Sequence, residues 1–396
     1  MKLLHTADWH LGQTFYEYDR REEHWAFLEW LGVQVKTNGV DLLLIAGDVF
    51  DTQNPSAYSQ RMYYSFLYNI TAENPNLQII IIAGNHDSAA RLEAPNPLLK
   101  AMNITVRGIV RRTADGEIDF DNLIIPLNKG GVCLAVPYLR QGDYPHSSTY
   151  AEGVQKLYTE LIGKAKAQNN LPIIAMGHLQ ATGSEISERD KSERTIIGGL
   201  ESISPEAFDA GVIYTALGHL HKAQRVSSRE NVRYSGAPLP MSFAERKNKQ
   251  GVNLVTIGEE TKIERLEFDA PVKLITIPNR PKSLKEVLGE ITALPEGKID
   301  RLSPFLEVKV LITEPEPSLR RDIEIALEGK AVRLARLEAV IHRPEGETRK
   351  IMTYEELQKI DPLNMATDIF KRKYGGDNMP EEMKRMLNEV IGGIQR

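Results

Sequence analysis

Residues 40–51 read VDLLLIAGDVFD, and residues 77–88 read LQIIIIAGNHDS. In each stretch an apolar run is followed directly by glycine and then by polar side chains. Such nearly continuous apolar runs are typical of strands buried on both faces, as in the parallel sheets of α/β proteins. Functional loops collect at the ends of these strands, because the rigid sheet fixes the loops that leave it. The two stretches therefore predict an α/β sheet with functional residues at Asp48 and Asn85.

The sequence around these strands continues the α/β pattern to about residue 260. Lys2–Thr6 is expected to form a strand, and Arg21–Lys36 an amphipathic helix. Asn54 and Pro55 are expected to be the N-cap and first residue of a helix that runs to about Ile70. Further strands are expected at Val132–Val136, Pro172–Gly177, Val212–Leu217, Val232–Tyr234 and Gly251–Ile257.

The pattern changes after Asp269, where a β-α-β-α-β order predicts a small α+β domain at residues 270–347. The proline-bearing segments Pro278–Pro281 and Glu314–Pro317 are expected to lie between its elements. The expected elements are a strand at Val272–Ile277, a helix at Leu284–Leu294, a strand at Phe305–Ile312, a helix at Leu319–Leu327 and a strand at Arg336–His342.

Residues 348–396 are expected to form a tail of two amphipathic helices. Thr353 and Glu356 have the spacing of a capping box, and Gly375–Gly376 with Pro380 separates the helices. The tail packs either on its own domain or against a helix of a partner, and the pattern alone leaves both open. The predicted domains are thus residues 1–269, 270–347 and 348–396. One face of the second helix gathers Met383, Met386, Leu387, Val390 and Ile391.

The composition is that of an ordinary globular chain, with 396 residues, 41% of them apolar, and a net charge of -5. No apolar run approaches the ~20 residues that a membrane span needs, and no signal peptide is visible, so we expect a cytoplasmic protein. The single cysteine, Cys133, excludes an internal disulfide and is expected to pack in the core. A negative net charge is not the mark of a nucleic-acid binder, but bound metal ions or a partner would supply local positive charge. Charge alone therefore leaves the substrate open.

Five short motifs place metal-ligand types mostly just after the apolar strands. Asp8 and His10 are two residues apart, so they point to the same side of an extended chain, and His219 and His221 repeat this spacing. Asp48 emerges from an apolar strand, where a carboxylate needs a strong positive partner. The motifs are Asp8-Trp9-His10, Gly47-Asp48-Val49-Phe50-Asp51, Gly84-Asn85-His86-Asp87, Gly177-His178 and Gly218-His219-Leu220-His221.

Mixed histidine, aspartate and asparagine ligands suit divalent manganese, iron or zinc better than calcium. Two such ions about 4 Å apart clamp a phosphodiester, lower the pKa of a bound water and steady the in-line transition state. His86 is left over and is the expected general acid for the leaving oxygen, or a donor to the phosphate. Each motif alone is as typical of an ordinary turn, so the prediction depends on the ordered set. The histidines at positions 5, 24, 146 and 342 are expected to be structural or solvated. The expected ligands are Asp8, His10, Asp48, Asn85, His178, His219 and His221.

Longer stretches around the motifs include KLLHTADWHLG at 2–12, AGDVFD at 46–51, AGNHDS at 83–88, LGHLH at 217–221, YSGAP at 234–238, SFAE at 242–245 and KQGV at 249–252. This set resembles the calcineurin-like metallophosphoesterase superfamily and, within it, the SbcD nuclease subunits of bacterial and archaeal DNA repair complexes. The resemblance is strong over residues 1–260. In the rest of the chain, the order of the elements is similar more than the motifs are. It implies a two-sheet α/β sandwich with two metals at one edge. One metal would lie on Asp8, His10, Asp48 and His221, the other on Asp48, Asn85, His178 and His219, with His86 assisting the leaving group.

The resemblance also implies the ion, the substrate and the partners. The ion would be manganese, and the substrate DNA, cut as a 3′-to-5′ exonuclease on duplex ends and as an endonuclease on single strands or hairpins. A homodimer would work with SbcC, an ATPase with a long coiled coil, in DNA repair and recombination. Residues 271–345 would cap the site and contact DNA, and the tail helices at 353–395 would dock on the coiled coil. The two early helices, Arg21–Lys36 and Asn54–Ile70, would contribute to the dimer surface.

Several residues admit two interpretations. Some relatives have histidine where this chain has Asp51, which here would orient a metal-binding loop or a neighbouring histidine. The tyrosines at 58, 63, 64 and 68 would stack on bases or, more simply, pack their helix. The basic runs Arg111–Arg112, Arg189–Arg194 and Arg246–Lys249 would contact phosphates or stay solvated.

Three rival functions remain to be weighed. Phosphoserine phosphatases of this superfamily carry an arginine shortly after the second motif, where this chain has Asp51-Thr52-Gln53. A phosphodiesterase for small molecules would not need the capping and tail segments. A binding scaffold on the same fold would show gaps in the metal set, and here the set is complete. The sequence therefore favours a nuclease, with another two-metal phosphodiesterase as the alternative.

Overall fold

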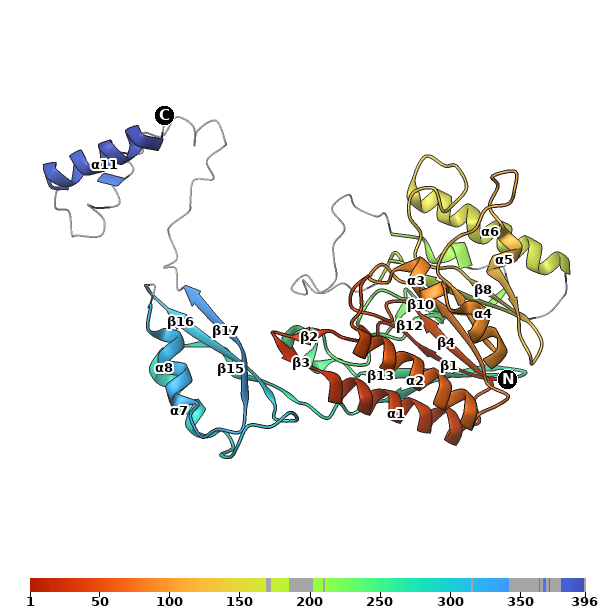
Figure 1. Cartoon of the computed structure of the whole chain (residues 1–396), viewed down its shortest axis with the longest axis horizontal. Helices are drawn as coiled ribbons and strands as arrows, with labels where there is room; N and C mark the ends of the chain where they lie inside the picture. Colours follow the sequence, from red (N-terminus) through yellow and green to blue (C-terminus); the bar gives the residue numbers. More distant parts are fainter. Residues whose placement is uncertain are drawn as a thin grey trace. The chain divides into compact units, whose positions relative to one another are not determined.

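The computed structural model describes residues 1–168, 172–184, 202–208, 211–314, 316–341, 363, 366, 367, 370 and 379–394. The chain divides into two compact units, residues 1–340 and residues 341–396, and each is described by itself. Two six-stranded sheets make up most of the first unit (Figure 1). A third, three-stranded sheet lies toward its end.

The first sheet has the order β14-β13-β1-β4-β5-β6. Four of its strands run parallel, and β13 pairs antiparallel with β1 and with β14. The chain therefore returns to complete this sheet long after its first strands are made. The bounds are β1 Lys2–Thr6, β4 Leu42–Ala46, β5 Gln78–Ile82, β6 Ile104–Arg107, β13 Gly251–Ile257 and β14 Thr261–Glu267.

The second sheet has the order β11-β12-β10-β9-β8-β7. Its four central strands are parallel, and β7 and β11 are antiparallel edge strands. This mixed arrangement confirms the predicted α/β class with two sheets. The bounds are β7 Ile124–Pro126, β8 Val132–Ala135, β9 Ile173–His178, β10 Val212–Gly218, β11 Gln224–Val226 and β12 Arg229–Tyr234.

Alternating residues of the central strands fill two different cores. On β4, Leu42 and Leu44 face the second sheet, where they join Cys133 and Met176, and Leu43 packs beneath the helices. Both faces of the strand are buried, which explains the continuous apolar run in the sequence. Cys133 is fully buried, as expected from its apolar stretch.

Helices cover the outer faces of both sheets (Figure 1). α1 (Arg21–Asn38) and α2 (Ala57–Glu73) pack on the first sheet, and α6 (Tyr150–Gln168) packs on the second. The predicted N-cap of α2 at Asn54 is wrong. Ser56 is the N-cap of this helix, because its side chain accepts a hydrogen bond from Ser59 N–H. The shorter elements are β2 Thr14–Phe15, β3 Tyr18–Asp19, α3 Ala89–Glu93, α4 Asn96–Leu99 and α5 Phe120–Leu123.

The third sheet has the order β15-β16-β17 and carries two helices with a core of their own. The predicted β-α-β-α-β order is confirmed. The placement of Pro278–Pro281 between elements is wrong, because both prolines lie inside β15. They are accepted there because β15 is an edge strand whose pairing shifts register between Ile277 and Lys282. The bounds are β15 Leu274–Lys282, α7 Leu284–Thr292, β16 Phe305–Ile312, α8 Leu319–Ala326 and β17 Arg333–Ile341.

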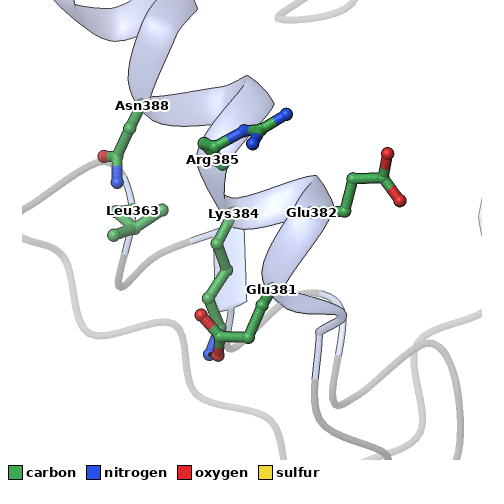
Figure 2. A pocket seen from close by; sticks show the side chains of 6 residues that line it. All are labelled: Leu363, Glu381, Glu382, Lys384, Arg385 and Asn388. Atoms are coloured by element: carbon green, nitrogen blue, oxygen red, sulfur yellow. Dashed lines mark hydrogen bonds and ion pairs between the residues drawn. The ribbon is translucent and has the colours of Figure 1, made fainter.

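The second unit contains α11 (Glu381–Ile394), which matches the second predicted tail helix. Figure 2 shows its first turns beside Leu363, where Lys384 donates a 2.6 Å hydrogen bond to Glu381. Met383 and Met386 of the predicted apolar face are 50% and 61% exposed, so in this unit they are not part of a core. None of the described helices combines the length and apolar character needed to cross a bilayer. Several predicted features lie outside the described residues, namely Arg189–Arg194, His342, Thr353, Glu356 and Gly375–Gly376.

Candidate metal centre

The seven predicted ligands come together where parallel strands of both sheets end. Parallel strands present their carboxyl ends at one edge, so loops far apart in sequence meet there. The site therefore needs both sheets. Asp8 and His10 follow β1, Asp48 follows β4, Asn85 follows β5, His178 ends β9, and His219 and His221 follow β10.

Four of these residues have a left-handed backbone that side chains other than glycine rarely adopt. The φ angles are 56° at Asp8, 46° at His10, 49° at Asp48 and 101° at His219. Hydrogen bonds hold the conformation, since His10 N–H donates to Asp48 O over 3.0 Å. Strained backbone at such positions is a mark of functional sites, where surrounding structure fixes an unfavourable conformation.

Two of the motif glycines are required by close approach. A Cβ on Gly84 would lie 2.1 Å from Asp48 Oδ1, and a Cβ on Gly218 would lie 1.9 Å from Ala46 O. Any side chain at either position would therefore displace the loops that carry the ligands.

The first group of ligands is almost completely buried. Ligand atoms of Asp8, His10 and His221 all lie within 4.8 Å of one another. His10 Nε2 is 3.7 Å from Asp48 Oδ2, which joins this group to the next. Asp8 Oδ2 and His10 Nε2 are buried without a hydrogen-bond partner. A buried carboxylate oxygen left unpaired beside imidazole nitrogens fits a cation bound between them.

The second group surrounds Asp48 on its other side. His178 Nε2 lies 3.3 Å from Asp48 Oδ2 and 3.0 Å from Asn85 Oδ1. His219 Nδ1 lies 3.1 Å from the same Asn85 oxygen. His178 Nδ1 donates to Ala46 O over 2.8 Å, so Nε2 is the nitrogen that faces Asp48. Burial lowers the pKa of His178, but Asp48 and Asp8 outweigh it and raise the pKa to about 9, so a cation that binds here would displace the Nε2 proton. A histidine with its second nitrogen tied to a carbonyl in this way is oriented as a metal ligand.

Burial and mutual charge strongly perturb these groups. Burial raises the pKa of Asp8 to about 7, although His178 and His221 oppose the shift. Burial would also raise the pKa of Asp48, but the histidines around it, His178 first, hold it well below its usual range. Burial lowers the pKa of His219 to about 3, with His178 adding to the effect. Since ligands must lose their protons to hold a cation, metal binding here should release protons and strengthen as the pH rises.

His86 lies at the open side of the site. Its ring is half-buried, and its centroid is 4.7 Å from that of His10. Nδ1 donates to the main-chain oxygen of Asp51 over 2.8 Å, so Nε2 is the ring atom available to a substrate. The Asp51 carboxylate lies 3.3 Å from His10 Nδ1. Asp51 thus contacts both histidines, consistent with the expected orienting role.

Two positioning residues were not assigned a role from the sequence. The Asp87 carboxylate accepts hydrogen bonds from Gly84 N–H, Val49 N–H and Phe50 N–H over 2.9, 3.2 and 2.9 Å, and so ties two ligand loops together. Burial raises its pKa to about 6, and Asp48 adds to the shift, so Asp87 is still mostly ionised at neutral pH. The sequence feature that could have identified Asp87 is its place in the motif Gly84-Asn85-His86-Asp87, which follows β5.

The second unassigned residue is Glu245, which is buried behind the first group. Its Oε1 lies 3.3 Å from His221 Nδ1, and its Oε2 accepts from Met241 N–H over 2.9 Å. A carboxylate on the far nitrogen of a ligand histidine fixes the ring and raises its basicity. Only its place in the SFAE stretch could have pointed to it.

Comparisons with known proteins agree with this geometry. Residues 1–223 match the calcineurin-like phosphoesterase family, and residues 270–374 match the family described as type 5 capsule protein repressor C-terminal domain. The chain is 36% identical to the D subunit of nuclease SbcCD from Rhodobacter capsulatus over 379 residues, which cover 91% of this chain and 92% of that protein. It is 30% identical to the Escherichia coli protein of the same name, with 99% and 97% covered. Identity to the Bacillus subtilis protein of that name is 28%, with 100% and 99% covered.

The first match spans more than half of the chain, and two of the relatives are at least 30% identical over nearly the whole length. The strand-end loops rich in histidine and aspartate lie inside the matched phosphoesterase segment. The chain is therefore a metallophosphoesterase nuclease and belongs, within the calcineurin-like phosphoesterases, to the family of SbcD nuclease subunits of SbcCD complexes.

Proposed function

We propose that the chain cuts DNA phosphodiester bonds with two divalent metal ions shared through Asp48. The observation that supports this most is the position of Asp48, whose Oδ2 lies 3.7 Å from His10 and 3.3 Å from His178. One ion would be held by Asp8, His10, Asp48 and His221, and the other by Asp48, Asn85, His178 and His219. The mixed nitrogen and oxygen ligands suit manganese, iron or zinc, and among these we propose manganese, the ion that the family resemblance implies.

When bound, two such ions clamp the phosphate, lower the pKa of an attacking water and neutralise charge in the transition state. The remaining work belongs to the side chains. Asn85 and His219 are half-buried, so we place the entry of the phosphate beside them. His86 would carry a proton on Nε2 and give it to the leaving 3′ or 5′ oxygen, because its Nδ1 proton is already donated to Asp51.

The names of the relatives support further assignments. They are subunits of an SbcCD complex, so we assign an SbcC-type ATPase as partner of this chain. From the family resemblance we further propose that the complex contains two copies of the chain. Duplex ends, cut from 3′ to 5′, and single strands or hairpins are the proposed substrates, in DNA repair and recombination in the cytoplasm. Residues 270–347 would cap the site and contact DNA. The tail at 348–396 would dock on the coiled coil of the ATPase.

The test compares a labelled linear duplex with a small phosphodiester, bis(p-nitrophenyl) phosphate, in manganese. The wild-type chain, with its ATPase present in a parallel reaction, is expected to degrade the duplex. Asp48→Asn, which removes the shared carboxylate, is expected to lose both activities and to bind less manganese. Turnover of the small diester without any cutting of DNA would overturn the nuclease assignment and leave a small-molecule phosphodiesterase. Full activity of Asp48→Asn would overturn the two-metal arrangement.

A further inference from the structure

A cavity of about 490 Å³ opens between the edges of the two large sheets, outside the metal centre. It is bounded by β11 and β12 on one side and by β13 and β14 on the other. Its described lining residues include five basic side chains and no carboxylate. The basic residues are Lys222, Arg233, Lys247, Lys249 and Arg265.

Two of the basic side chains form ion pairs with acids outside the cavity lining. Arg233 forms an ion pair with Glu230, and Lys249 forms one of 2.5 Å with Glu267, neither acid lining the cavity. These pairs are solvent-exposed, so they hold their partners weakly and can be exchanged for another anion. Basic side chains thus gather at this cavity although the net charge of the chain is -5. Local concentration of one sign on an acidic chain marks a surface for a ligand of opposite charge.

The guanidinium of Arg265 lines the cavity and is held in place by three hydrogen bonds. It donates to Ser235 O over 2.7 Å, to Asn253 Oδ1 over 3.1 Å and to Lys249 O over 2.9 Å. These acceptors are neutral, so the positive charge of this largely buried group is not cancelled by a carboxylate in contact. Burial accordingly lowers the pKa of Arg265 to about 10. A bound anion would supply the missing countercharge.

The cavity shares two chain segments with the metal centre. Lys222, which lines the cavity, directly follows His221 of the metal centre in the chain. Lys247 follows two residues after Glu245, which orients His221. The cavity and the metal centre are therefore built partly from the same two loops.

We propose that this cavity is a second phosphate site, which binds a backbone phosphate of the DNA strand away from the bond that is cut. The inference depends on the proposed function, since it names how the same substrate is held. A contact to a backbone phosphate carries no sequence information, so this site would bind DNA of any sequence. The site would position the strand and take no part in the chemistry.

The test uses Lys247→Gln/Lys249→Gln, because both side chains are exposed and their replacement leaves the core intact. A matched control, Lys100→Gln/Lys156→Gln, removes two exposed lysines elsewhere on the surface. For each protein, duplex affinity is measured against salt concentration in calcium, and turnover of bis(p-nitrophenyl) phosphate is measured in manganese. The cavity variant is expected to bind duplex about five- to twentyfold more weakly. The expected loss is no larger because each exposed ion pair between a lysine and a phosphate contributes little to the binding free energy.

Its slope of log affinity against log salt should fall by about one for each phosphate that is no longer bound, while turnover of the small diester stays at the wild-type rate. Equal duplex affinity and slope in the cavity variant and the control would overturn the inference. The inference would also be overturned if the cavity variant bound duplex with unchanged affinity but was inhibited less by inorganic phosphate. That result would show that the cavity binds a free anion and not DNA. Failure of the wild type to bind or cut any DNA would instead overturn the proposed function.

Discussion

The main-chain N–H of His86 donates a 2.8 Å hydrogen bond to Oδ1 of Asp48. The proposed general acid is thereby tied to the carboxylate that both metal groups share. Because the bond uses the main chain, the imidazole can be removed without releasing Asp48. Metal binding and proton transfer can therefore be separated by mutation at position 86.

We expect His86→Ala to cut duplex DNA about 10²- to 10⁴-fold more slowly, the usual contribution of a general acid. Manganese binding by calorimetry should be unchanged. Turnover of bis(p-nitrophenyl) phosphate should fall less than about tenfold, because p-nitrophenolate leaves without a proton. An equal loss on both substrates would show that His86 acts on the phosphate or the metals and not on the leaving oxygen.

Replacing Asp87 by alanine should destabilise the fold as well as the site. The change leaves three main-chain N–H groups of two loops without their acceptor, in a fully buried position. We expect a loss of about 3–5 kcal/mol in the free energy of unfolding, measured with urea. Asp115→Ala, in an exposed loop, is the control and should change this free energy by less than about 0.5 kcal/mol. If Asp87→Ala were as stable as the wild type, water would have to accept the hydrogen bonds of these three N–H groups in place of the carboxylate.

Glu245 should affect only one of the two proposed ions. We expect Glu245→Ala to weaken one manganese site about 10- to 100-fold, because His221 loses the group that orients it. Glu245→Gln keeps an acceptor oxygen and should recover most of the affinity, while Glu264→Gln, exposed on β14, should have no effect. Calorimetry that resolves two sites checks this. Equal weakening of both sites would argue that Glu245 supports the whole loop.

Two buried histidines outside the site should make the fold sensitive to acid. Burial lowers the pKa of His5 and of His24 from 6.5 to about 3. The unfolded chain then binds more protons than the folded chain between these values, so stability falls as the pH drops through that window. Each histidine should remove about 2 kcal/mol between pH 7 and pH 5. His5→Gln and His24→Gln should each reduce the slope of unfolding free energy against pH, whatever their stability at pH 7. An unchanged slope in both variants would contradict the assignment.

The buried sheets could be predicted because their signal is local. β4, β5 and β10 are covered on both faces, so nearly every residue is apolar, and the ligands follow immediately. β14 could not be found in the same way, because it is an edge strand with charged residues along an exposed face. The prediction that Pro278–Pro281 lies between elements failed for a related reason. β15 is an edge strand, and an edge strand accepts prolines that a central strand excludes.

Much of the site geometry depends on contacts between distant segments. The ordered set of motifs predicted that Asp8 and His178 belong to one site, but not that they would share a ligand group or that the backbone would be left-handed at Asp8. Nor did the sequence connect His221 with Glu245, because the contact depends on how the chain turns after β12.

The long return of the chain to its first sheet also limits when the centre can form. Asp8 and Asp48 are made early, but His219 and His221 follow more than two hundred residues after Asp8, and β13 must still pair with β1. On the ribosome, the early part of the nascent chain thus exposes half a set of ligands with neither sheet complete. Metal would enter only near the end of synthesis of the first domain, so the nuclease stays inactive until it is folded.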